Sequence, residues 1–348
     1  MNSNPKTKYL DILQIFRGIA ALMVVLHHSI KSIQYYHEIN YPFLNYIGSI
    51  GKFGVDFFFV LSGFIITYSA SFKYDEPDSF KRYIQNRLIR IYVPYLPIGI
   101  FMLVLYQLLP AFSNGSRDMS ILTSLTLIPA GNPALSVAWT LSFELLFYLL
   151  FSISFVSKKL WNGFVLVWFI SIIIFTYSPL STFQFFKIPI FSTLFSPYNV
   201  EFIFGYCLAL CVIRKLKLPL ILGILPLTVI MSSFFYYSLN KLNFFKFDLN
   251  LLFALGIFII LYIAIDNYNF KIKSNRILML IGNATYSIYL VHNPLQMIVI
   301  RMYPKISSNA SLLIAIAVVL ILSSVVGYLY YLIFEKKVMM KIKSKLVN

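Results

Sequence analysis

The feature of this chain that most constrains its fold is a series of ten long apolar runs. A helix needs about 20 mostly apolar residues to cross a bilayer, and most of these runs reach that length. Hydrophobic residues make up 59% of the 348 residues and charged residues only 12%, so a water-soluble fold would lack polar cover for its surface. The sequence therefore predicts an all-α, polytopic transmembrane bundle of about ten spans. The runs lie near residues 9–30, 53–72, 91–111, 137–156, 160–178, 199–213, 218–237, 248–266, 279–300 and 311–334.

The positions of the Lys and Arg residues predict the orientation of this bundle. With the N-terminus in the cytoplasm, 20 of the 29 basic residues fall in inner segments, 8 in outer segments and Arg17 within the first run. Cytoplasmic loops carry such an excess of Lys and Arg. Both termini are therefore expected in the cytoplasm, and the protein is expected to be a multi-pass protein of a plasma or inner membrane. The same rule accounts for the net charge of +17 without nucleic-acid binding.

A single membrane domain is expected over residues 1–348, with no appended soluble domain, because the connectors are short. The first run is expected to be retained as a span, since it is too long for a cleavable signal peptide and carries Arg17. Cys207 and Cys211 lie four residues apart in one run. That spacing favours two small buried side chains over a disulfide.

Ionisable residues inside the apolar runs are costly and are therefore candidates for function. Arg17 and His28 are 11 residues apart, which places them about 20° apart around a helix and about 16.5 Å apart along it. His27 would lie about 80° from Arg17. A neutral imidazole can take a proton from a hydroxyl, so this face could perform acyl transfer. An interfacial histidine and an arginine paired with a carboxylate are the structural alternative. The ionisable residues found inside the apolar runs are Arg17, His27, His28, Asp56, Glu144, Glu201 and His292.

Two carboxylic acids could assist that histidine. Asp56 in GVDFFFVLSGF and Glu144 in WTLSFELLFYLL could orient the imidazole and stabilise its charged form, as the carboxylate of a catalytic triad does. Either could instead be a buried partner of Arg17 or of a backbone donor. His292, in the ninth run, is expected to be either a hydrogen-bonded structural histidine or a site residue, and Glu201 is left without a role.

A pair of arginines marks the inner end of the third run. Arg87 and Arg90 in NRLIRIYVPY are one helical turn apart and share a helix face. Guanidinium groups bind phosphates with matching geometry, so the pair could hold a phosphorylated donor; positive-inside anchoring is the alternative. The sequence carries no glycine-rich phosphate loop, no serine-nucleophile elbow and no grouping of metal ligands. No metal is therefore expected.

Taken in order, five segments resemble the landmarks of acyltransferase family 3 of membrane proteins. Arg17 to His28 resembles that family's signature of Arg, ten residues, then His. It is followed by GVDFFFVLSGF, the arginine pair before Pro94, AWTLSFELLFYLL and GNATYSIYLVHNP. The Trp-Thr-Leu and Glu-x-x-x-Tyr pattern is similar to the exopolysaccharide and O-antigen branch. Gln14 stands where many members have an acid, and Glu335 matches a family glutamate whose following proline is missing.

The resemblance implies an O-acyltransferase that moves an acyl group, usually acetyl, from acyl-CoA (acetyl-CoA) to a carbohydrate hydroxyl. It implies that His28 is the catalytic base and that the arginines bind the acyl donor. The implied partners are membrane lipid, acyl-CoA and a carbohydrate acceptor. Trp139, Tyr148, Ser287 and His292 are expected to be substrate-binding or structural positions. Intramembrane charges also mark transport paths, so a flippase or transporter of a lipid-linked glycan is the alternative, and a scaffold without chemistry is another.

Overall fold

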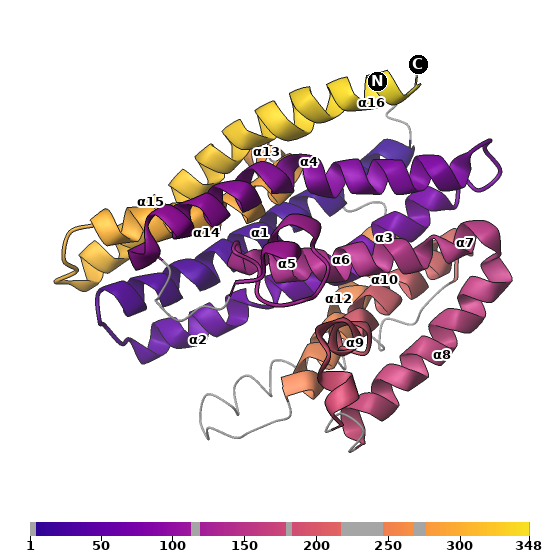
Figure 1. Cartoon of the computed structure of the whole chain (residues 1–348), viewed down its shortest axis with the longest axis horizontal. Coiled ribbons are helices and arrows are strands. Elements are labelled where there is room, and N and C mark those ends of the chain that lie inside the picture. Colours follow the sequence, from indigo (N-terminus) through magenta and orange to yellow (C-terminus); the bar gives the residue numbers. More distant parts are fainter. Residues whose placement is uncertain (1–4, 113–118, 179–182, 217–245, 267–275, 348) are drawn as a thin grey trace. The chain divides into compact units, whose positions relative to one another are not determined.

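A computed structural model describes residues 5–112, 119–178, 183–216, 246–266 and 276–347. Every regular element in these ranges is a helix (Figure 1), apart from one isolated bridge between Met119 and Asn132. The predicted run near 218–237 lies outside the described residues. The regular elements include η1 (Pro110–Phe112), α5 (Ile121–Thr126), η2 (Ser136–Ala138), α7 (Ile153–Val156), η4 (Gln184–Lys187), α9 (Pro189–Leu194) and α16 (Met339–Val347).

Seven helical stretches of the described chain are long and apolar enough to cross a membrane. They coincide with seven of the predicted runs. α12 (Lys246–Asp266) and α14 (Thr285–Met302) cover most of two further runs. The predicted all-α polytopic bundle is therefore confirmed, while the count of ten spans stays a prediction. The seven stretches are Ile12–Tyr36, Phe43–Ala70, Ser79–Leu108, Ser136–Val156, Lys158–Tyr177, Pro189–Ile213 and Asn309–Lys345.

Two segments expected to be connectors are largely helical. Within 31–52, α1 (Pro5–Tyr36) continues past its apolar run and α2 (Pro42–Gly51) follows it. Within 73–90, α4 (Ser79–Leu108) begins two turns before Arg87. A helix can continue beyond its apolar part because its backbone hydrogen bonds do not depend on hydropathy. Arg87 and Arg90 therefore stand on the part of α4 that precedes its apolar run.

The predicted run 279–300 is divided into two helices. α13 (Arg276–Asn283) ends before Ala284, and α14 begins at Thr285. The one strongly polar residue at the break, Asn283, is outweighed by the apolar residues on both sides, which predicted one continuous span. Ala284 provides no side-chain cap for α14. The first turn of α14 therefore needs hydrogen-bond acceptors from elsewhere in the fold.

The chain forms two compact units. The first comprises residues 1–13, 55–84 and 146–275, and the second comprises residues 14–54, 85–145 and 276–348.

In the second unit, α14 packs along three other helices. It runs parallel to α1, because Gly282 just before it lies against the Gln14 carbonyl and Gln296 near its end lies against Val25. A Cβ on Gly282 would come within 2.1 Å of that carbonyl oxygen, so the close approach requires glycine. α15 (Asn309–Tyr330) lies antiparallel beside α14 (Figure 1), with Tyr303 at the turn bonded to Ser311.

The fourth helix of this group, α4, also runs parallel to α14. Tyr286 donates to the Ile91 carbonyl at 3.0 Å, and farther along both helices Tyr106 contacts the Met297 sulfur at 3.8 Å. The ten-span scheme has the first, third and ninth spans running outward and the tenth inward. The relative directions of these four helices are the ones that this scheme requires, while the side of the membrane that each end faces stays a prediction.

In the described part of the first unit, α3 (Gly54–Ala70) and α10 (Tyr198–Ile213) pack backbone to backbone. A Cβ on Gly205 would come within 2.0 Å of the Val60 carbonyl oxygen, and the Phe59 and Phe202 rings stack 4.6 Å apart. The two helices run in the same direction, as expected of the second and sixth spans. α6 (Trp139–Phe151) and α8 (Lys158–Tyr177) meet where Phe151 contacts Trp161.

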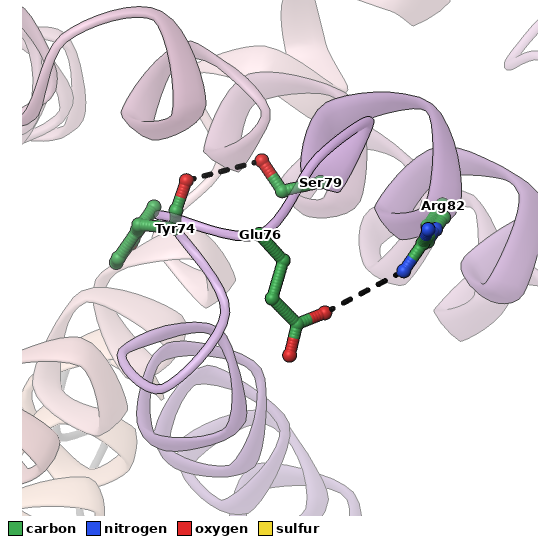
Figure 2. Close-up of polar contacts among 4 residues, drawn as sticks. All are labelled: Tyr74, Glu76, Ser79 and Arg82. Carbon is green, nitrogen blue, oxygen red and sulfur yellow. Dashed lines mark hydrogen bonds and ion pairs between the residues drawn. The ribbon is translucent and has the colours of Figure 1, made fainter.

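The short connector between α3 and α4 is held by its own polar contacts (Figure 2). Ser79 donates to the Tyr74 carbonyl at 3.2 Å, and an exposed ion pair joins Arg82 to Glu76 at 3.8 Å. Such a surface pair contributes only about 0–1 kcal/mol. The Tyr74 hydroxyl donates to Ser154 at 3.2 Å, and burial raises the pKa of Tyr74, so this donor stays protonated. These contacts order the chain as it enters α4.

Candidate active site

α1 carries both residues of the Arg-to-His signature on one continuous helix. Arg17 and His28 are each partly buried, and Arg17 Nη1 donates to Gln14 Oε1 at 3.1 Å. Because the helix is unbroken between them, the two side chains keep the angular offset of about 20° that their spacing requires. Gln14 stands where many members of the resembling family have an acidic residue, and its amide oxygen still accepts a hydrogen bond from Arg17.

The two adjacent histidines of α1 have different surroundings. His27 is buried and its Nδ1 donates to the carbonyl of Gly48 on α2. His28 is partly exposed. Its ring centroid lies 5.0 Å from that of His27 and 5.3 Å from that of His292. His27 thus joins α1 to α2, and His28 is the more exposed of the two histidines.

Gln296, a residue that the sequence reasoning missed, fixes the turn of α1 that holds His28. Its Nε2 donates to the Val25 carbonyl at 3.1 Å and to Ser29 Oγ at 3.0 Å. Ser29 Oγ itself donates to the Val25 carbonyl at 2.7 Å. Gln296 is 1% exposed. The sequence signal that could have identified it was a polar amide inside an apolar run, four residues after His292.

His292 is fully buried at 0% exposure. Its Nδ1 bonds the Tyr289 carbonyl at 2.6 Å, and its ring lies 5.6 Å from the Tyr289 ring. The Tyr289 hydroxyl donates to the Val137 carbonyl at 3.1 Å and lies 2.8 Å from the Thr140 hydroxyl. The ninth-run motif is therefore joined to the start of the Trp-Thr-Leu motif, although Tyr289 and Thr140 are 149 residues apart in sequence.

Two further site residues lie near this junction. Trp139 is at the surface of α6, 36% exposed, and its ring contacts Phe143. Glu144, one and a half turns farther along, is partly buried and close enough to Tyr289 to interact with it electrostatically. The second unit therefore gathers Glu144, Tyr289, His292 and His28 in one polar region. The contact that would make Glu144 the orienting acid of His28 stays a prediction.

Ser287 has a structural partner that the sequence reasoning gave little weight. Its backbone N and its Oγ both donate to Glu335 Oε1, at 3.1 and 2.6 Å. Glu335 is 5% exposed and stands in the π-helical stretch η5 (Tyr331–Val338) that continues α15. Ser287 is the third residue of α14, so its N–H has no acceptor within that helix. Glu335 thus supplies the cap that Ala284 lacks.

The arginine pair lies on α4 of the second unit. Arg87 and Arg90 are both partly buried, and Arg90 interacts electrostatically with Tyr331. Pro94 and Pro97 follow inside the helix, and the Tyr330 hydroxyl donates to the Pro94 carbonyl at 2.7 Å. This bond ties α4 to the end of α15. Because Arg87 and Arg90 are three residues apart within α4, they share a helix face. Phosphate binding by the pair would need this arrangement.

Asp56 and Tyr148 belong to the first unit. Asp56 is hydrogen-bonded to Glu201, and both are buried, at 3% and 2% exposure. One of two carboxyl groups that share a hydrogen bond must carry the proton. Tyr148 is buried and its carbonyl accepts from Tyr83 at 3.1 Å. Asp56 thus has an acid as a partner, and its proposed action on the histidine of α1 stays a prediction.

Comparison with known proteins identifies the family. The model of the acyltransferase domain family (Acyl_transf_3) matches residues 9–332. The chain belongs to this acyltransferase family. The match runs from α1 into η5 and so includes every candidate residue except Glu335. The protein is a multi-pass membrane acyltransferase, and the predicted resemblance is confirmed.

One curated relative of this acyltransferase is the exopolysaccharide production protein ExoZ of Rhizobium meliloti (strain 1021). The two are 26% identical over 253 residues, which cover 70% of this chain and 76% of the relative. No solved structure gives a significant match. Among the residues that the structure describes, no group of three or more His, Cys, Asp or Glu side chains could hold a metal ion.

Proposed function

We propose that the protein transfers an acyl group, acetyl in the first instance, from cytoplasmic acyl-CoA to a hydroxyl of a cell-surface or lipid-linked carbohydrate. The observation that carries this proposal is the partly exposed His28 on α1, on the same helix face as Arg17, in a member of an acyltransferase family. The name of the relative, an exopolysaccharide production protein, supports a polysaccharide acceptor.

In this proposal the donor enters from the cytoplasmic side. Arg87 and Arg90 hold the CoA phosphates at the inner end of α4, because two guanidinium groups on one face give paired, charge-assisted bonds. Arg17 lies farther along the donor path. The pantetheine arm follows the face of α1 for about 16.5 Å between Arg17 and His28, which brings the thioester to the histidine.

His28 acts as the general base. Its neutral imidazole takes the proton of the acceptor hydroxyl as the oxygen attacks the thioester carbonyl. When the tetrahedral intermediate collapses, the carbon–sulfur bond breaks and the imidazolium returns the proton to the departing thiolate. The products are the O-acyl sugar and CoA, and no metal is needed. Asp56 and Glu144 are the candidates for stabilising the imidazolium charge.

The location follows from the same proposal. The protein spans a bacterial inner or plasma membrane about ten times with both termini in the cytoplasm, and residues 1–348 act as a single membrane domain. The donor arginines then face the acyl-CoA pool, and His28 lies near the outer side, where a glycan would meet it.

Mass spectrometry of the surface glycan, with and without this protein, tests the proposal. The expected result is loss of an ester-linked acyl group with a normal amount of glycan. Loss of the glycan itself would favour the flippase or transporter alternative. Re-expression of the unchanged protein should restore the ester, and this serves as the control.

A further inference from the structure

The buried ring of His292 presents an acceptor nitrogen that no described residue satisfies. Its Nδ1 lies 2.6 Å from the Tyr289 carbonyl oxygen. A carbonyl can only accept, so Nδ1 carries the hydrogen. In the neutral ring, Nε2 then has a lone pair. Nε2 is buried and has no hydrogen-bond partner within the described part of the chain, although an unsatisfied buried polar atom costs about 1–3 kcal/mol.

The ring of His28 lies close enough to His292 to provide a partner for this nitrogen. The two ring centroids are 5.3 Å apart and the ring planes make an angle of 45°. A ring nitrogen lies about 1.1 Å from its centroid, so two imidazoles joined by one hydrogen bond of about 2.9 Å have centroids about 5 Å apart. The observed centroid distance of 5.3 Å is therefore compatible with a hydrogen bond between an N–H of the partly exposed His28 ring and Nε2.

The backbone around both rings is fixed. Gln296, one turn after His292 on α14, bonds Val25 and Ser29 on either side of His28. The distance between the two histidines is therefore set by packing between α1 and α14.

We propose that His292 is a positioning residue for the acyl transfer: its Nε2 accepts the N–H of His28 and so selects the tautomer in which the other nitrogen of His28 is the base. This rests on the proposed function. A histidine whose N–H is held in this way offers its free nitrogen to the acceptor hydroxyl, as the carboxylate arranges in a triad. A neutral acceptor does this without placing a buried anion in the membrane, which would be costly.

The proton balance of the reaction is unchanged. The hydroxyl proton moves to the free nitrogen of His28 and later to the thiolate of CoA. The proton between the two histidines stays on His28 throughout, and His292 stays neutral with its own hydrogen on Nδ1.

Two substitutions of His292 separate positioning from packing. In His292→Gln, the amide oxygen reaches about the place of Nε2, so an acceptor for His28 remains while the bond to Tyr289 is lost. In His292→Asn, the amide nitrogen reaches about the place of Nδ1, so the bond to Tyr289 remains while the acceptor is lost. Initial rates of transfer from acetyl-CoA to purified glycan would give kcat and KM for both purified proteins.

The expected result is a kcat within about tenfold of the unchanged protein for His292→Gln and a loss of about 10²-fold or more for His292→Asn, with little change in either KM. The opposite order, or equal kcat values, would overturn the proposal, because a purely structural histidine needs its bond to Tyr289. Failure of the proposed function is distinct, since the unchanged protein would then transfer no acyl group.

A third variant tests the same assignment and does not depend on how the side chains of His292→Gln and His292→Asn are oriented. His292→Ala leaves a space for a five-membered ring, and small ligands occupy such engineered cavities. Imidazole has both a donor and an acceptor nitrogen, whereas pyrrole has only the donor. Imidazole should raise kcat at least tenfold and pyrrole should not. Equal rescue by both, or no rescue by imidazole, would contradict the assignment.

Discussion

The bond between Ser287 and Glu335 is expected to stabilise the start of α14, the helix that carries His292 and Gln296. One buried carboxyl oxygen accepts both the backbone N–H and the hydroxyl of Ser287, at 3.1 and 2.6 Å. Hydrogen bonds to charged groups contribute about 1.5–3 kcal/mol each, but the two share one acceptor and are not additive. Glu335→Leu should therefore lower the free energy of unfolding by about 2–4 kcal/mol.

Graded variants at the same two positions make the expectation specific. Glu335→Gln keeps an oxygen that can accept both bonds, so it should cost only about 1 kcal/mol, the part due to charge at a helix N-terminus. Ser287→Ala removes the hydroxyl and keeps the N–H, so it should cost about 1–2 kcal/mol. In the Glu335→Leu background, Ser287→Ala should cost nearly nothing, because the hydroxyl has already lost its acceptor.

Thermal unfolding of the purified protein in detergent measures these differences. A loss of 2–4 kcal/mol corresponds to a fall in Tm of roughly 3–6 °C for a chain of 348 residues. The expected order of midpoints is the unchanged protein, Glu335→Gln, Ser287→Ala and Glu335→Leu. If Ser287→Ala lowered the midpoint equally with and without Glu335, the bond would not be the source of the stability, and the reasoning would be refuted.

Further expectations concern the donor site and the orientation. Replacing both Arg87 and Arg90 by Ala should raise the KM for acyl-CoA about tenfold or more, with Lys replacements recovering only part, because the paired fork is lost; an unchanged KM would leave the pair as membrane anchors. In a background without Cys207 and Cys211, a cysteine at Lys305 should react with an impermeant thiol reagent in intact cells, and one at Lys159 should not. The reverse pattern would place His28 at the cytoplasmic end.

Much of the helical fold could be predicted from local sequence. The length of the apolar runs identified the spans, and the 11-residue spacing placed Arg17 and His28 on one face of α1. Both properties depend on residues within one helix, for which spacing alone fixes the geometry. The break at Ala284 was missed, because the apolar residues on both sides outweigh the single polar Asn283 in the hydropathy of the whole run.

The contacts that the site residues make with other helices could not be predicted from local sequence. His292 meets the ring of His28 from another helix, and Gln296 bonds Ser29 across a separation of 267 residues. Glu335 reaches Ser287 from the π-helical stretch η5, 48 residues away. Such contacts are set by how helices pack, and no local pattern specifies the register between two helices.

Asp56 illustrates the same limit in the first unit. Its burial in a span was a sound reason to expect a function, but its hydrogen bond to Glu201 depends on α3 and α10 lying backbone to backbone at Gly205. The sequence showed two isolated acids, and only the packing of the two helices shows that they form a pair.

The most direct test of the central claim compares the two neighbouring histidines in a transfer assay with labelled acetyl-CoA and purified glycan. His28→Ala and His28→Gln should each reduce the rate by about 10²–10⁴-fold, because neither side chain can take the hydroxyl proton. His27→Ala should lower stability by about 1–3 kcal/mol, since the Gly48 carbonyl loses its buried donor, but it should keep most of the activity. Equal losses at positions 27 and 28 in folded protein, or an active His28→Gln, would contradict the assignment of His28 as the base.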